Sequence, residues 1–336
     1  MVHVTDDSAV ERKAPDAIAV IRSIVSPDAL MLNVAQWYEI AAPLTCRLLK
    51  RGLNDTYLLT TVCGPYVLRV YRAGWRSEEE IRYELDLLRH LAAKGLGVSV
   101  PIATRDDRLF LPLGAPEGTR PLVLFTYASG TRASWSVPED AYDIGTAAAT
   151  IHAASDDFAS RWPRASLDSD YLINRPLVAI RPFLAHRPAD LAYLERFTDG
   201  LKAEVAALVA NGLDWGVCHG DFGPKNIHKN GDGRLTIFDF DLCGPGWRAL
   251  DLSLIRWVAA DHRNNALWKA FLRGYSATRR LSATDLSAVP VFHAAAHLSS
   301  LGLFAENVGD WGAADMSDWL FDRELEFFRT WEPTRV

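Results

Sequence analysis

Residues 216–228 read GVCHGDFGPKNIH and gather His, Asp, Lys and Asn side chains around glycines and a proline. Ordinary core sequence avoids this mixture, because each buried polar group must find a hydrogen-bonding partner. Residues 227–241 continue as IHKNGDGRLTIFDFD, in which two short extended stretches flank Asn-Gly-Asp-Gly, a strong turn signal. The sequence therefore predicts a β-hairpin directly after a polar loop.

The predicted hairpin brings oxygen-bearing side chains together at one end. Asn226 begins the first strand and Asp239 ends the second, and residues paired across an antiparallel ladder lie roughly 5 Å apart. Asp221 lies in the loop just before Asn226. An Asn and an Asp suit Mg²⁺, a hard cation that takes oxygen ligands and keeps water positions for substrate phosphates. Asp221 would then face a bound substrate, where it could accept a proton from an attacking hydroxyl.

Composition sets the broad class of protein. Of the 336 residues, 49% are hydrophobic and 23% are charged, as in a globular protein with one large domain or two lobes. The net charge of −6 argues against nucleic acid as a partner, because phosphate binding needs concentrated Lys and Arg. We expect no membrane partner, since no unbroken apolar run approaches the ~18 to 20 residues of a spanning helix.

Two further features bear on the compartment. Residues 1–10 carry two acids and do not read as a signal peptide. The four cysteines lie far apart, with no CxxC pair and no His at zinc-ligand spacing. We therefore expect reduced thiols in a cytoplasmic protein, and the sequence leaves its oligomeric state open.

Hydrophobic patterning divides the chain into three parts and predicts an α+β fold. Residues 1–40 read as an N-terminal helical extension, 41–128 as a small antiparallel-sheet lobe, and 129–336 as a larger, mainly helical lobe with the hairpin embedded in it. The expected strands outside the hairpin lie in 44–61, 66–71, 98–101, 108–113 and 121–130, and the expected helices lie in 27–40, 77–95, 136–154, 189–211, 247–260, 264–280, 285–306 and 317–330.

Two capping signatures mark the beginnings of helices. Ser77 and Glu80 form an S-x-x-E capping box ahead of apolar residues at helical spacing, and Gly95 ends that run. Ser136 and Glu139 repeat the signature ahead of the segment YDIGTAAATIHAA. We expect a capped helix after each serine.

The spaced residues resemble a known constellation. H-G-D-x-x-x-x-N, followed shortly by D-F-D, is similar to the catalytic and metal-binding segments of the aminoglycoside phosphotransferase and choline kinase superfamily, which has the protein-kinase-like two-lobe fold. Gly244-Pro245-Gly246 and Leu250-Asp251-Leu252 fit the trailing segment of that family. The resemblance covers roughly residues 44–330 and is specific in 217–252.

The resemblance implies roles for the hairpin and its loop. Asp221 is expected to be the catalytic base, and Asn226 and Asp239 the ligands of a Mg²⁺ ion that accompanies ATP. Asp251 is expected to support the catalytic loop, and His219 to bond backbone near that loop. Asp241 is expected to assist the metal or the substrate. Apart from the resemblance, Trp311 is interpreted either as a packing anchor or as a residue that lines a substrate cleft.

The resemblance also implies a nucleotide site in the sheet lobe. The bend RGLND (51–55) is expected to overhang the phosphates through Gly52 and Asn54, and backbone groups around Thr126 and Ala128 to meet the adenine. Arg69 stands where many members of the family have Lys, with Glu84 as its expected ion-pair partner. We favour Arg69 as the phosphate-contacting cation, because its charge has the right sign and Glu84 remains.

These features predict an ATP- and Mg²⁺-dependent kinase whose acceptor is a hydroxyl group of a small molecule, such as an amino alcohol, an amino sugar or an antibiotic. The acidic segment 306–326 either attracts a cationic acceptor or forms a solvated surface. Gly223, where protein kinases have a Lys, argues for the small-molecule branch, and Lys225 is not assumed to replace that Lys. Residues 238–253 also resemble homoserine-kinase-like enzymes and a bacterial stress-response Ser/Thr kinase. A protein Ser/Thr kinase and a weakly catalytic nucleotide-binding regulator therefore remain alternatives.

Overall fold

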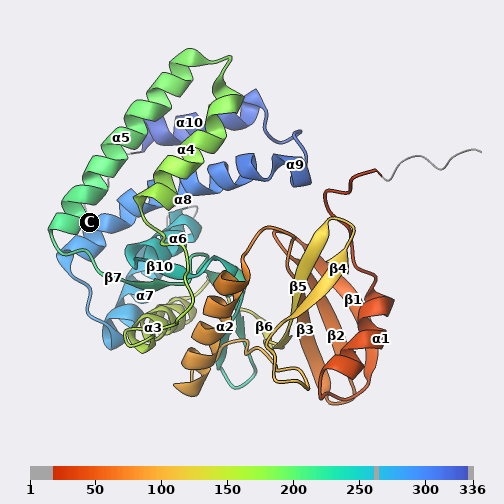
Figure 1. The fold of residues 1–336 in the computed structure, drawn as a ribbon. Helices are drawn as coiled ribbons and strands as arrows, with labels where there is room; N and C mark the ends of the chain where they lie inside the picture. Colours follow the sequence, from red (N-terminus) through yellow and green to blue (C-terminus); the bar gives the residue numbers. More distant parts are fainter. Residues whose placement is uncertain (1–17, 261–264, 332–336) are drawn as a thin grey trace, which may run out of the picture.

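An antiparallel sheet forms the first part of the molecule. The computed structural model describes residues 18–260 and 265–331 (Figure 1). Five strands pair in the order β1-β2-β3-β5-β4. They are β1 (Pro43–Arg51), β2 (Asp55–Thr61), β3 (Gly64–Val70), β4 (Leu111–Ala115) and β5 (Gly118–Thr126).

Two helices flank this sheet. α1 (Pro27–Trp37) covers its outer face through Leu30 and Val34, which are buried with apolar residues of β2, β3 and β5. α2 (Glu78–Ala93) lies on the opposite side, between the sheet and the helical part (Figure 1). The capping box predicted for α2 is confirmed, because Ser77 Oγ accepts from the Glu80 N–H at 3.2 Å and Glu80 Oε2 accepts from the Ser77 N–H at 3.1 Å.

The second part is mainly helical and holds short strands. β8 (Ile227–Lys229) and β9 (Leu235–Ile237) pair antiparallel, as predicted from the turn between them, and β6 (Thr131–Arg132) pairs with β8. β7 (Trp215–Cys218) pairs with β10 (Gly244–Trp247). The helices are α3 (Pro138–Ala154), α4 (Arg175–Ile180), α5 (Pro188–Ala210), α6 (Ala249–Ala260), α7 (Asn265–Thr278), α8 (Ala283–Glu306), α9 (Val308–Trp311) and α10 (Asp318–Thr330), with shorter turns η1 (Asp170–Asn174), η2 (Arg181–Leu184), η3 (Pro224–Asn226) and η4 (Phe240–Leu242).

The predicted α+β fold class, with a sheet-rich N-terminal part and a helical C-terminal part, is confirmed. The chain leaves the sheet after Thr126 and enters the second part at Thr131. The domain boundaries at residues 40 and 128 remain predictions. The first seventeen residues of the expected N-terminal extension lie outside the described residues, and helix in the described remainder is confined to 27–37.

Two local predictions are wrong. Residues 98–101 were expected to form a strand, but they make only isolated bridges, Val98 to Ile237 and Pro101 to Phe125, because the segment passes between two sheets and ends on a residue without an N–H. Ser136 and Glu139 do not cap α3. That helix begins at Pro138, whose fixed φ starts it two residues later, and its N-cap Val137 makes no side-chain bond. The helical segment 170–184 was not predicted.

α8 is the central helix of the second part. Among the described residues it alone is long and apolar enough to cross a membrane by length and composition, and 67% of its apolar window is buried inside the protein. Its neighbours are α4, α5 and α6, and thirteen of its residues are buried. This burial is the behaviour of a core helix.

Glycines allow α3 and α7 to approach closely. A Cβ placed on Gly145 of α3 would lie 2.1 Å from the Phe271 carbonyl oxygen, and one on Gly274 of α7 would lie 2.0 Å from the Tyr142 carbonyl oxygen. Real Cβ atoms do not approach backbone that closely, so the packing of these two helices depends on both glycines.

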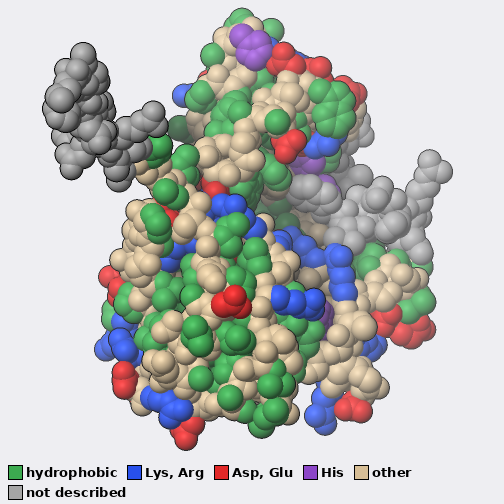
Figure 2. Space-filling view, turned by 90° about the vertical axis from the view of Figure 1, so that its right-hand side faces the viewer, with side chains coloured by type: hydrophobic (Ala, Val, Ile, Leu, Met, Phe, Trp, Pro, Cys, Tyr) green, Lys and Arg blue, Asp and Glu red, His purple; other side chains and the backbone are tan. Residues whose placement is uncertain are grey.

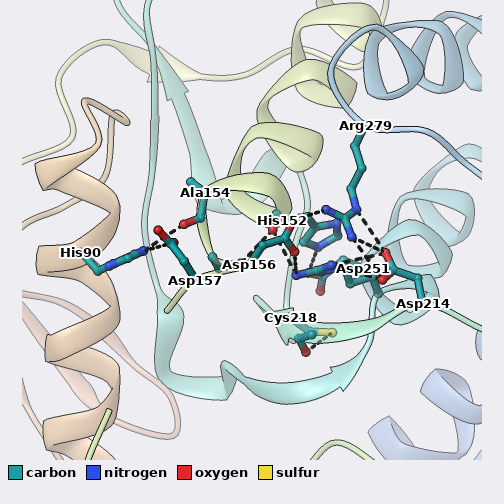
Figure 3. Close-up of polar contacts among 12 residues, drawn as sticks. His90, His152, Ala154, Asp156, Asp157, Asp214, Cys218, Asp251 and Arg279 are labelled. Atoms are coloured by element: carbon teal, nitrogen blue, oxygen red, sulfur yellow. Dashed lines mark hydrogen bonds and ion pairs between the residues drawn. The ribbon is translucent and has the colours of Figure 1, made fainter. Parts of the chain in front are cut away.

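A buried carboxylate joins the helical core to the loop after β7 (Figure 3). Asp251 of α6 accepts hydrogen bonds from the backbone N–H groups of His219 at 2.7 Å and Gly220 at 2.9 Å, and it contacts His152 Nε2 at 3.0 Å. His152 Nδ1 in turn lies 2.8 Å from the Tyr275 hydroxyl. Burial alone would raise the pKa of Asp251, but the hydrogen bond and charge of His152 hold that pKa below its ordinary value.

Replacement of Gly145 by Ala should destabilise the protein by about 1–3 kcal/mol, because the added methyl group forces α3 and α7 apart. The measurement is urea unfolding followed by circular dichroism. Gly200→Ala is the matched control, since Gly200 also lies inside a helix but has open space at its Cβ position. That change should stabilise the protein by about 0.5–1 kcal/mol. Equal effects at the two sites would contradict the packing argument.

Asp251→Asn should lower the free energy of unfolding at pH 7 by about 3 kcal/mol, because one amide oxygen cannot replace a carboxylate that accepts from several buried donors. The folded-state pKa of Asp251 lies below its unfolded value. Its contribution is therefore fully present above about pH 4 and is lost as the pH falls through the folded-state pKa. Urea unfolding of both proteins from pH 7 to pH 3 should give a difference that shrinks toward acid. A difference independent of pH would rule out this role of the carboxylate charge.

Candidate active site

A cavity of about 880 Å³ lies between the sheet and the helical part. Figure 2 shows Lys and Arg side chains gathered at the waist between the upper and lower parts of the molecule. The cavity is lined by both acids and bases from distant parts of the sequence. Its acidic residues are Asp221, Asp239, Asp241 and Glu306, and its basic residues are Lys50, Arg69, Arg132, Arg175 and Lys225.

The loop after β7 has a fixed conformation. Gly220 has φ +78°, and a Cβ at this position would lie 2.2 Å from the Leu242 carbonyl oxygen, so only glycine fits. The Asp221 N–H donates to His219 Nδ1 at 3.2 Å, which leaves Nε2 as the protonated nitrogen that donates to the Phe238 carbonyl at 3.1 Å. His219 is fully buried and bonds backbone on both sides, as a structural residue does.

Asp221 has two polar neighbours in the same loop. Asn226 Nδ2 donates to the Asp221 carbonyl oxygen at 2.9 Å and to its Oδ2 at 3.0 Å. Lys225 Nζ lies 2.7 Å from Asp221 Oδ1 and its side chain is 55% exposed. The sequence analysis gave Lys225 no role. Its position four residues after Asp221 is the signal that could have predicted this contact. The carboxylate is thus held between an amide and a cation.

The end of the hairpin brings Asp239 to the same cavity. The Phe238 N–H bonds the Asn226 carbonyl at 3.0 Å, so Asn226 lies beside the segment that carries Asp239. Asp239 has φ 66° and ψ 56°, a left-handed conformation that is uncommon for residues other than glycine. Such strained residues cluster at functional sites, where the surrounding structure holds them in place.

Arg69 connects Asp239 to α2. Its Nη1 lies 2.7 Å from Glu84 Oε1, and its Nη2 lies 2.9 Å from Asp239 Oδ1. Glu84 is fully buried and also accepts from the Tyr71 hydroxyl at 2.8 Å. Burial alone would lower the pKa of Arg69, but the charges of Glu84, Tyr71, Asp239 and Asp241 together outweigh burial and hold that pKa well above its ordinary value. The structure therefore places Arg69 with the partner expected from the sequence.

The donor set near Asp221 fits a hard divalent cation. Because Asn226 Nδ2 is used by Asp221, the amide oxygen is the atom of Asn226 that remains for a cation. Asp239 offers a carboxylate that is 40% exposed. Within residues 18–260 and 265–331, no three His, Cys, Asp or Glu side chains cluster as a metal site. Two protein oxygens with phosphate and water completing the shell are the usual arrangement for Mg²⁺.

Asp241 is occupied by other groups. Its Oδ2 accepts from Trp75 Nε1 at 2.8 Å, and its Oδ1 lies 3.2 Å from Arg76 Nε. Its backbone carbonyl accepts from Arg76 at 2.7 Å and also from Arg164. Burial alone would raise the pKa of Asp241, but the charges of Arg76, Arg69 and Arg164 hold it below its ordinary value. This geometry ties the turn after the hairpin to the segment before α2. Asp241 also lines the cavity, and its expected role toward the metal or the substrate stays a prediction.

The expected nucleotide-binding residues divide into two groups. Gly52 and Asn54 lie in the hairpin turn between β1 and β2, and both line the cavity. Arg69 of β3 lines it as well. Thr126 and Ala128 are not among the lining residues. The Thr126 N–H donates to the Val100 carbonyl at 2.9 Å, and the Ala128 carbonyl accepts from His228 Nδ1 at 2.6 Å. Those two backbone groups are used within the protein, so their expected contact with adenine remains a prediction.

The far end of the cavity is formed by the helical part. Trp311 lines it, 5.1 Å from Phe304 between ring centroids in an edge-to-face arrangement. The acidic segment 306–326 does not present free charge at most of its positions, because five of its seven acids pair with neighbouring bases. These are Glu306, Asp310, Asp318, Asp322 and Glu324. Attraction of a cationic acceptor by this segment therefore loses its main support.

Comparison with known proteins agrees with the sequence resemblance. The Phosphotransferase enzyme family matches residues 45–284. An uncharacterized protein of Deinococcus radiodurans is 38% identical over 317 residues, covering 93% of this chain and 92% of that protein. The homoserine kinase of Sinorhizobium fredii is 28% identical over 269 residues, covering 77% of this chain and 76% of the kinase.

A solved structure supports the same assignment of the fold. The microcompartment-associated aminopropanol kinase superposes with a TM-score of 0.72 at 21% identity, covering 90% of this chain and 94% of that one. The predicted relation to the aminoglycoside phosphotransferase and choline kinase superfamily is confirmed. Because the family match spans well over half of the sequence, this chain belongs to the phosphotransferase enzyme family.

Proposed function

We propose that this enzyme transfers the γ-phosphate of ATP, in the presence of Mg²⁺, to a hydroxyl group of a small molecule. The single observation that carries the proposal is the convergence of Asp221, Asp239 and Arg69 on one cavity, although they lie far apart in the sequence. Phosphoryl transfer needs little covalent chemistry from a protein and depends on positioning and on charge stabilisation. These three residues supply a base, a metal ligand and a cation.

Each residue has a defined task in the proposed reaction. Asp221 orients the acceptor hydroxyl and takes its proton as the oxygen bonds to the γ-phosphorus, while the bond to the β–γ bridging oxygen breaks and ADP leaves. Lys225 and Asn226 hold the Asp221 carboxylate in place. Asn226 and Asp239 would hold Mg²⁺, which when bound neutralises charge on the phosphate oxygens.

Arg69 is proposed to provide positive charge to the phosphates from the sheet side. Its guanidinium pairs with Glu84 and reaches the cavity. The Lys expected at this position in the family would have to make the same two contacts. This geometry argues against the alternative of a weakly catalytic nucleotide-binding regulator, for which the substitution at Arg69 was the only hint.

The class of acceptor is a finer part of the proposal. The helical end of the cavity combines apolar and aromatic side chains with the hydroxyls of Ser299 and Ser300. Relatives include a homoserine kinase and an aminopropanol kinase, whose names describe small hydroxyl compounds bearing an amino group. We therefore infer that a hydroxylated amine or amino acid is the acceptor. A cytoplasmic location remains an expectation. A protein Ser/Thr kinase activity remains an alternative to the proposed small-molecule kinase.

The proposal predicts Asp221-dependent phosphorylation of a small hydroxyl compound. Purified enzyme with ATP and Mg²⁺ is tested against amino alcohols, hydroxylated amino acids, amino sugars and Ser/Thr peptides, with ADP release and product mass as readouts. Asp221→Asn should lower turnover of the best acceptor by roughly 10³-fold or more, because it removes the base and leaves the rest of the cavity intact.

Nucleotide affinity should stay within about threefold in Asp221→Asn, since Asp221 faces the acceptor rather than the phosphates. Phosphorylation of peptides alone would favour the Ser/Thr kinase alternative. Nucleotide binding without turnover of any acceptor would favour the regulator.

Asp239→Ala should weaken Mg²⁺-dependent binding of the analogue AMP-PNP at least about tenfold, because it removes a proposed metal ligand. Isothermal titration with and without Mg²⁺ measures this difference. Asp232→Ala is the matched control, since it removes an exposed acid from the turn of the same hairpin. Equal AMP-PNP affinities in wild type and Asp239→Ala would contradict the metal assignment.

A further inference from the structure

A group of ion pairs crosses from α9 to the sheet above the nucleotide end of the cavity. Asp310 Oδ2 lies 2.6 Å from Arg22 Nη1 and 3.5 Å from Arg72 Nη1, and Asp310 Oδ1 lies 3.9 Å from Arg51 Nη2. The side chains of Arg22 and Asp310 are only 2% and 9% exposed. We call these four residues the Asp310 bridge.

The Asp310 bridge is attached directly to the turn between β1 and β2. Arg22 Nη1 also donates to the Gly52 carbonyl oxygen at 2.7 Å, and Arg22 Nη2 pairs with Asp55. The Arg72 N–H donates to Asn54 Oδ1 at 3.2 Å. Arg22 and Arg72, two of the three arginines around Asp310, therefore also contact the turn and its end, Arg22 through its side chain and Arg72 through its backbone N–H.

The acidic partner of the bridge comes from the other side of the cleft. α9 follows α8 at the end that faces the segment before α1 (Figure 1), and the Arg72 side chain also donates to Asn307 at the start of α9. Arg22 and Asp310 both lie outside residues 45–284, the part of the chain that matches the family. The bridge thus joins residues beyond both ends of the matched segment to Arg51 and Arg72 within it. The sequence analysis gave Arg22 no role and included Asp310 only in the acidic segment 306–326.

We propose that Asp310 is a positioning residue that fixes the Gly52–Asn54 turn over the nucleotide phosphates and thereby sets the affinity for nucleotide. This inference rests on the proposed function, because it takes the cavity beneath the turn as the nucleotide site. The turn is short and contains a glycine, so it has little stiffness of its own. The Arg22 side chain holds the Gly52 carbonyl of this turn, and Asp310 supplies charge that keeps the Arg22 guanidinium in place.

The charge balance explains why Asp310 matters more than an ordinary surface acid. Arg22 is almost fully buried, so its cation depends on close anionic partners. Asp55 is shared with the buried Arg120, at 2.7 Å. Loss of the Asp310 charge would leave Arg22 and Arg72 competing for fewer acceptors, and the Gly52 carbonyl would lose its fixed donor.

The experiment compares Asp310→Asn, Asp310→Glu and the control Asp199→Asn. Asp199 is an acid on α5 that pairs with Lys202 within the same helix and is 74% exposed. Two measurements are made. Isothermal titration gives the Kd and the stoichiometry of AMP-PNP with Mg²⁺, and amide hydrogen exchange is followed in the peptide that contains residues 51–55. Partial unfolding would lower the stoichiometry, whereas a misplaced turn would raise the Kd at unchanged stoichiometry.

Asp310→Asn should raise the Kd roughly 5- to 20-fold and speed exchange in residues 51–55, as expected when a coupling between packed groups is lost. Asp310→Glu should recover most of both effects, and Asp199→Asn should change neither. Unchanged exchange in Asp310→Asn would overturn the Asp310 bridge as a support of the turn. Faster exchange with an unchanged Kd would overturn its effect on nucleotide binding.

The two proposals fail in different ways. If wild-type enzyme does not bind AMP-PNP, the proposed nucleotide site is wrong, and with it the claim about affinity. The hydrogen-exchange comparison would still decide whether Asp310 holds the turn, because that measurement needs no nucleotide.

Discussion

The carboxylate of Asp251 is the constraint on which the site depends. Two successive backbone N–H groups, those of His219 and Gly220, point at this one buried side chain, and they fix the backbone immediately before Asp221. His152 and Tyr275 continue the network into α3 and α7, so the loop is fastened to two helices that pack closely against each other. The side chain proposed as the catalytic base, which lies on an irregular loop, is thereby given the rigidity of the helical core.

Local patterns in the sequence predicted the elements whose signals are complete within a few residues. The Asn-Gly-Asp-Gly turn and the Ser77 capping box formed as predicted, because their geometry is set by the residues themselves. The capping signature at Ser136 failed because Pro138 competes for the helix start. Residues 98–101 have strand-like side chains, but tertiary placement between two sheets gave them only isolated bridges. The strand propensity of a segment is a local property, and the surrounding elements determine whether that segment forms a strand.

The candidate site shows the same division. The approach of Asn226 to the segment of Asp239 followed from one hairpin, and the Arg69–Glu84 pair followed from family resemblance. The contact between Arg22 and Asp310 spans most of the chain and belongs to no short motif, so no pattern in the sequence could reveal it. Asp241 stood beside Asp239 in a suggestive triplet, yet Trp75 and Arg76 bind both of its carboxylate oxygens. Spacing in the sequence identifies candidate residues, and the folded structure shows which contacts each of them already makes.

Arg69 contacts both Glu84 and Asp239, and this arrangement has a consequence for the metal proposed at Asp239. One guanidinium nitrogen holds Glu84 while the other holds Asp239, so the acid proposed as a metal ligand already has a counter-charge supplied by the protein. A single ammonium nitrogen could not serve both acids through separate atoms. If Asp239 holds a divalent ion as proposed, that ion would share the carboxylate with the guanidinium that already contacts Oδ1. The metal and the protein's own cation would then both lend positive charge to this part of the cavity.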